Sequence, residues 1–189
     1  MNISNPKDIL KFMDEIKYGW VDINDNIHYD MKDFRLNYRT MSTKKTLEYK
    51  VGTCIEQTIL MKYFLDEVKI KNEIYCTRIY EDENFNDLNA KERMHCFVLF
   101  YDDKAVYQIE HPDPNRKGIH KFSSREDAIK FLVKHYEKMT INDYKEKGIL
   151  VKEENIRRTT TKFDYVPANL TYKEFNLYIN SLDKKILKR

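Results

Sequence analysis

Apolar residues recur every three to four positions in several stretches of the chain, a spacing typical of one buried helix face. Asn5-Pro6 can cap and start the first such helix, which we expect to reach about residue 17 before Gly19 ends it. The same spacing, with capping residues such as Ser42, Ser123 and Thr171, predicts further helices at about residues 31–38, 43–49, 54–67, 123–138 and 171–187.

Strands are predicted where β-branched and aromatic residues cluster or alternate with polar ones. This pattern gives a short hairpin over residues 20–23 and 27–29, and strands at about 73–80, 94–101, 104–110 and 157–166. Residues 81–93 form a polar loop long enough to overhang a site, and residues 111–120 should be a loop because they carry two prolines and a glycine. A helix first and a mostly antiparallel sheet afterwards indicate an α+β fold.

Composition fits a single domain over residues 1–189, because 41% hydrophobic residues can form a sizeable core. The net charge is +3 and the charges are interspersed, which favours a solvated surface over a nucleic-acid patch. The basic C-terminal cluster of Lys184, Lys185, Lys188 and Arg189 is interpreted as a solvated end. No apolar run approaches membrane-spanning length and no signal-peptide core is visible, so we expect a cytoplasmic protein that binds no membrane.

Three cysteines, Cys54, Cys76 and Cys96, form no CxxC pair, which fits reduced thiols better than disulfides or structural zinc. We therefore expect no metal or cofactor. Cys54 falls in the first turn of the predicted helix 54–67, where the free N–H groups and the helix dipole stabilise a thiolate. A single cysteine is more often a small buried hydrophobic residue, so this position alone does not define a site.

A histidine and a glutamate meet in the predicted hairpin of strands 94–101 and 104–110. With a two-residue turn at Asp102-Asp103, Tyr101 faces Lys104 and His95 lies directly across from Glu110. That is hydrogen-bonding reach for an imidazole and a carboxylate. The pair is the base and orienting acid that a cysteine nucleophile needs, or else a structural pair that joins two strands.

Other candidates have less support. Cys96 follows His95 and must face the opposite side of its strand, so we expect it in the core, together with Cys76. His111 and Asp113 could replace Glu110 if the register slips, and a metal site of Cys54, His95 and Cys96 matches no zinc pattern. The remaining histidines have no telling neighbours and are expected at the surface: His28, His120 and His135.

A cysteine at a helix start, followed by a strand histidine and a strand acid, resembles the transglutaminase-like cysteine-enzyme superfamily. The matching stretches are residues 52–57, 94–97 and 107–110. The stretch 49–54, with Glu110-His111 and 118–122, is similar to small uncharacterised bacterial members. The likeness covers a core at about residues 20–135 and leaves about 140–189 as a C-terminal extension.

The resemblance implies a papain-like α+β core in which the cysteine helix packs on an antiparallel sheet or partial barrel. It also implies Cys54 as nucleophile, His95 as base and Glu110 as orienting acid. The superfamily usually has aspartate at the acid position and often an aromatic residue after the histidine, where this chain has Cys96 and then Phe97.

The expected function is acyl transfer through a thioester: hydrolysis, deamidation or transamidation of a peptide, a protein or a small amide. The Cys54 N–H, with a donor from the Trp20 region, would stabilise the oxyanion. The alternatives are a catalytically inactive transglutaminase-like binding module and a nucleic-acid protein that uses the basic C-terminal helix.

Overall fold

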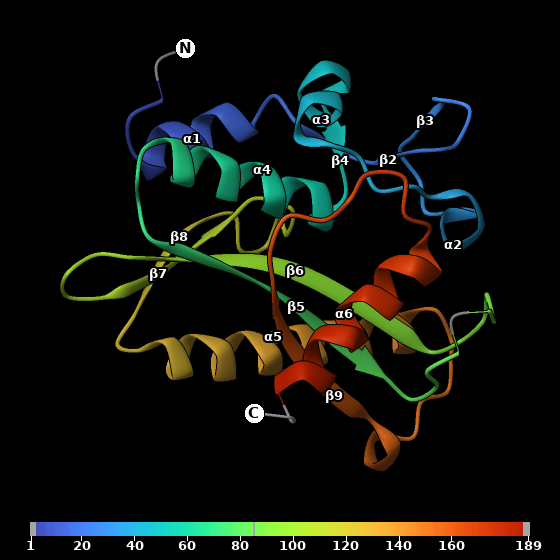
Figure 1. Ribbon diagram of the computed structural model, residues 1–189. Coiled ribbons are helices and arrows are strands. Elements are labelled where there is room, and N and C mark those ends of the chain that lie inside the picture. Colours follow the sequence, from blue (N-terminus) through green and yellow to red (C-terminus); the bar gives the residue numbers. More distant parts are fainter. Residues whose placement is uncertain (1–2, 85, 187–189) are drawn as a thin grey trace.

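The computed structural model describes residues 3–84 and 86–186, which form an α+β fold (Figure 1). The helices are α1 (Pro6–Met13), α2 (Phe34–Asn37), α3 (Thr43–Tyr49), α4 (Cys54–Glu67), α5 (Arg125–Glu146) and α6 (Tyr172–Ile186), with a 3₁₀ turn, η1 (Glu153–Asn155). The strands are β1 (Lys17–Tyr18), β2 (Trp20–Val21), β3 (Ile27–His28), β4 (Val51–Gly52), β5 (Asn72–Tyr80), β6 (Glu92–Tyr101), β7 (Val106–Glu110), β8 (Gly118–Phe122) and β9 (Arg157–Phe163).

The central sheet of the described chain has five antiparallel strands in the order β8-β7-β6-β5-β9. Helices α1, α3 and α4 lie on one side of this sheet and α5 on the other (Figure 1). Successive side chains of β6 point to opposite faces of the sheet, because the strand is pleated. Cys96, Val98 and Phe100 join the core under α4, whereas Phe97 and Leu99 pack against α5.

Helix α4 has the bounds that the sequence predicts. Thr53 and Glu56 form a capping box around its first turn, which fixes where the helix begins. All residues from 54 to 61 are buried, including the polar ones. Glu56 accepts hydrogen bonds from the Tyr38 hydroxyl (2.5 Å) and the Met41 N–H (3.3 Å). The segment that contains Tyr38 and Met41 therefore covers the start of α4, so this part of the helix is buried on more than one face.

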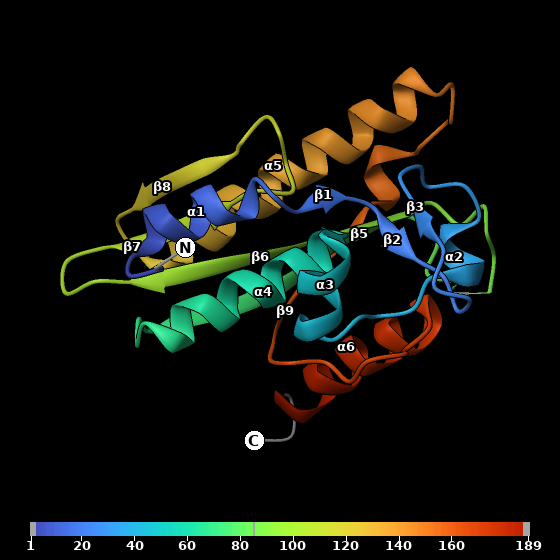
Figure 2. The ribbon, with the colours of Figure 1, turned by 90° about the horizontal axis from the view of Figure 1, so that it is seen from above.

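A short parallel pair fixes the chain beside the start of α4. Tyr18 of β1 lies opposite Gly52 of β4, two residues before Cys54. Gly19 allows this approach, because a Cβ there would lie 2.6 Å from the His28 carbonyl oxygen and 2.7 Å from Val51 Cγ2. Figure 2 shows β1 running across the same side of the sheet as α1 and α4.

Several predicted boundaries are wrong. Helix α1 ends at Met13, four residues early, whereas α5 continues to residue 146 because Tyr136, Thr140 and Tyr144 keep one face of it buried. The segment 111–120, predicted to be a loop, contains the start of β8 at Gly118, which pairs with β7.

The C-terminal part of the chain completes the same core. Strand β9 pairs with the free edge of β5, and Phe163, Phe175 and Ile179 pack in the layer that contains α4. The side chains of the predicted basic cluster at 184–189 lie outside the described residues. No helix in the described part of the chain is long and apolar enough to cross a membrane.

Candidate active site

The hairpin of β6 and β7 differs from its predicted register. Tyr101 pairs with Val106, so the turn has four residues instead of two, and the prediction that His95 lies directly across from Glu110 is wrong. The turn is longer because the Asp102 carboxylate accepts the N–H groups of Lys104 and Ala105. A shift by two residues keeps each side chain on its own face of the sheet.

His95 and Glu110 meet in spite of the shifted register. Glu110 lies beside Phe97 on the face that also carries His95, and its side chain reaches the imidazole diagonally, with 3.2 Å between Nε2 and Oε2. An aspartate here would be one methylene shorter. The longer glutamate side chain therefore suits this register.

The Glu110 carboxylate is buried and fully engaged. Its Oε2 also accepts Gln108 Nε2 at 2.7 Å and the Tyr136 hydroxyl at 3.0 Å, and its Oε1 accepts the Asp113 N–H at 3.0 Å. The Tyr136 ring packs on the His95 imidazole with centroids 4.1 Å apart. These contacts fix the acid and the imidazole in one orientation.

Cys54, the first residue of α4, lies at the open edge of β6. Strand β7 pairs with residues 98–101 of β6, so the Cys96 N–H on that edge is available to the cysteine sulfur. Hydrogen bonds from the Cys96 side chain and backbone, together with the nearby His95 charge, lower the pKa of Cys54 to about 7. Burial and the Glu56 carboxylate oppose this shift but do not cancel it.

The pKa of His95 is raised. Burial of the imidazole lowers this pKa, but the Glu110 charge and hydrogen bond, with smaller contributions from Cys54 and Asp113, outweigh burial. Because Nε2 is held by Glu110, Nδ1 is the nitrogen left for the thiol. The lowered pKa of Cys54 and the raised pKa of His95 both favour a thiolate–imidazolium pair.

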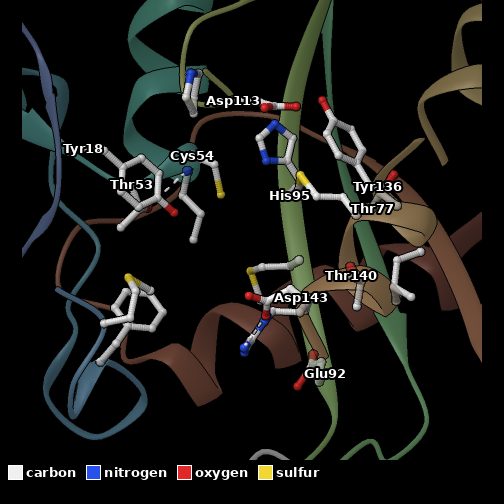
Figure 3. A pocket seen from close by; sticks show the side chains of 18 of the residues that line it. Tyr18, Thr53, Cys54, Thr77, Glu92, His95, Asp113, Tyr136, Thr140 and Asp143 are labelled. Atoms are coloured by element: carbon white, nitrogen blue, oxygen red, sulfur yellow. Dashed lines mark hydrogen bonds and ion pairs between the residues drawn. The ribbon is translucent and has the colours of Figure 1, made fainter. Parts of the chain in front are cut away.

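The side chains of Cys54 and His95 point into one cavity of about 390 Å³ (Figure 3). Residues at the start of α4, on one face of the sheet, and residues of α5, on the other face, both line this cavity. Much of the wall is apolar, from Met31, Phe34, Ile55, Ile79, Met94, Met139 and Tyr172. No group of three or more His, Cys, Asp or Glu suited to a metal ion occurs in the described residues.

The Trp20 side chain, from the region expected to supply an oxyanion donor, is engaged elsewhere. Its Nε1 donates to the Asp30 carbonyl oxygen at 2.7 Å, and its ring stacks on His28. Tyr18 lines the cavity instead, on the side of Cys54 and Thr53 (Figure 3). Tyr18 is 44% exposed overall, and the partial desolvation of its phenol and the neighbouring Cys54 charge raise its pKa, so the hydroxyl keeps its proton and remains a donor.

Sequence reasoning missed Tyr18, because β1 is a two-residue strand with no pattern of its own. The signal that could have revealed it is Gly19. A glycine after an aromatic residue suits a close backbone approach, and this approach brings β1 beside β4 and the start of α4.

The alternatives to Glu110 are bonded to other groups. His111 contacts Gln57 Oε1 through Nδ1 at 2.7 Å, and it lies 3.4 Å from Asp14 through Nε2. Asp113 pairs with His135 at 2.9 Å, and His135, expected at the surface, is partly buried.

The other two histidines expected at the surface are also partly buried, His28 against Asp22 and His120 against the Arg116 carbonyl oxygen. Cys76 and Cys96 are fully buried, as expected. No protein-family model and no curated protein matches the chain, so its function has to be argued from this geometry.

Proposed function

We propose that the protein is a cysteine-dependent acyl-transfer enzyme with a papain-like, transglutaminase-like core. The observation that carries the proposal is that His95 contacts a buried carboxylate and lines the same cavity as Cys54. The 3.2 Å contact of His95 with Glu110 and the lowered pKa of Cys54 support it. A buried histidine–glutamate pair with a purely structural role would need neither a cavity nor an activated thiol beside it.

In the proposed reaction the Cys54 thiolate attacks an amide or ester carbonyl carbon. The Cys54 N–H, at the first position of α4, has no partner within the helix and would donate to the oxyanion together with the Tyr18 hydroxyl. His95 would pass a proton from Nδ1 to the leaving group, which leaves a thioester. Water or an amine, deprotonated by His95, would then release the acyl group.

The cavity supports a substrate that presents an apolar group beside the carbonyl. Flexible methionine side chains adapt to varied apolar shapes, and a volume of about 390 Å³ holds a side chain or a small amide. Peptides, proteins and small amides therefore remain the proposed substrate classes.

Acylation by an activated ester tests the proposal. After brief mixing of the native protein with p-nitrophenyl acetate, intact mass should show one acetyl group, mapped to Cys54 and removed by hydroxylamine. The variants Cys54→Ser and His95→Asn should lose this acetylation, whereas Cys76→Ser, which changes a cysteine outside the cavity wall, should keep it. Acetylation spread over lysines, with none on Cys54, would refute the proposal.

A further inference from the structure

All three cysteines of the chain meet in the core beneath α4. Cys76 of β5 lies directly opposite Cys96 of β6, and both Cys76 and Cys54 lie near enough to the Cys96 thiol to raise its pKa. The three residues share one apolar cluster. A continuous row of thiols thus leads from the cavity into the sheet.

The three thiols differ in whether a molecule in the cavity can reach them and in whether they keep their proton. Cys54 borders the cavity, whereas Cys96 and Cys76 are fully buried. Burial and the two neighbouring sulfurs raise the pKa of Cys96 well above the usual thiol range, so Cys96 keeps its proton. A small oxidant that enters the cavity therefore meets the Cys54 thiolate first and finds a protonated thiol directly behind it.

We propose that Cys54 and Cys96 form a redox-active pair, in which a hydroperoxide oxidises Cys54 and Cys96 captures the product as a disulfide. The inference rests on the proposed function for the reactivity of Cys54, and it adds a regulation of that site.

The chemistry balances in two steps. In the first, the Cys54 thiolate attacks the terminal oxygen of the hydroperoxide. A sulfur–oxygen bond forms and the oxygen–oxygen bond breaks, so sulfur loses two electrons to the peroxide. The departing oxygen takes up the proton that Cys54 gave up and leaves as an alcohol, or as water when the oxidant is hydrogen peroxide. In the second, the Cys96 sulfur attacks the Cys54 sulfenic acid. The sulfur–sulfur bond forms, and the hydroxyl leaves as water with the Cys96 proton.

The disulfide would act on the site in two ways. It removes the nucleophile from acyl transfer, and it stops oxidation before the sulfinic acid, which dithiols do not reduce. A dithiol reductant then restores both thiols. Cys96 directly follows His95 in the chain. The same residue that lowers the pKa of Cys54 would also protect Cys54 from irreversible oxidation.

The test is disulfide mapping of the native protein after treatment with one equivalent of hydrogen peroxide. We expect a mass loss of about two hydrogens, a Cys54–Cys96 peptide pair after digestion, and full reversal by dithiothreitol. In Cys96→Ser, and in Cys96→Ala if the serine variant folds poorly, Cys54 should instead be trapped by dimedone and should progress to the sulfinic acid. The matched variant Cys76→Ser should still form the Cys54–Cys96 disulfide.

Each other outcome contradicts the inference. A Cys76–Cys96 disulfide, or equal dimedone labelling of Cys54 with and without Cys96, would show that Cys96 does not resolve Cys54. Iodoacetamide separates the two claims. Rapid alkylation of Cys54 without a peroxide-induced disulfide overturns the redox inference alone, whereas slow alkylation of Cys54 overturns the proposed function as well.

Discussion

Replacing Glu110 by glutamine removes the charge that raises the pKa of His95. Hydrogen bonds to charged groups contribute ~1.5–3 kcal/mol, so losing this charge and its hydrogen bond should lower the pKa of His95. A larger share of the imidazole would then be neutral at pH 7. Since the His95 charge helps to hold the pKa of Cys54 near 7, that pKa should rise by about one unit, toward the ordinary value of 9.0.

The assay is the rate of iodoacetamide alkylation of Cys54 as a function of pH. Thiolate accumulates as pH rises through the Cys54 pKa, so the midpoint in Glu110→Gln should lie about one unit higher and the rate at pH 7 should fall about fivefold. Glu56→Gln is the matched control, because that carboxylate raises the Cys54 pKa and its loss should move the midpoint downward. Equal midpoints in the wild type and Glu110→Gln, with both proteins folded, would refute the reasoning.

Three further perturbations test separate parts of the structure. Tyr18→Phe should slow acetylation by p-nitrophenyl acetate about 10²-fold while alkylation by iodoacetamide, which forms no oxyanion, stays unchanged; equal loss in both assays would contradict the donor role. Gly19→Ala should lower stability by about 1–3 kcal/mol in urea unfolding, because its Cβ would meet the His28 carbonyl oxygen at 2.6 Å. Phe175→Ala should cost about 3–5 kcal/mol, whereas Leu177→Ala on the exposed face of α6 should cost under about 0.5 kcal/mol; similar values for both would place α6 outside the core.

Local signals in the sequence determine where α4 begins. Thr53 and Glu56 cap it and Gly52 precedes it, so its bounds, and with them the place of Cys54 at its first position, follow from a few neighbouring residues. The contact of His95 with Glu110 follows from the sequence for a different reason, although the predicted register is wrong. The predicted turn was two residues too short, and an even error leaves side chains on the same face.

Long-range contacts explain what the sequence did not reveal. Tyr18 reaches the cavity through a pairing between segments that are far apart in the chain, and neither segment has a pattern of its own. The contact of Cys54 with Cys96 depends on the open edge of β6, which exists because β7 stops pairing at Val98. Such an edge cannot be read from residue types.

The central claim is that Cys54 is an activated nucleophile beside His95. The most direct test is the pH dependence of iodoacetamide alkylation, followed separately for the three cysteines of the native protein. Cys54 should be alkylated first, with a midpoint near pH 7, while the buried Cys76 and Cys96 react far more slowly. Three equally slow thiols, or a Cys54 midpoint near the ordinary 9.0, would contradict it.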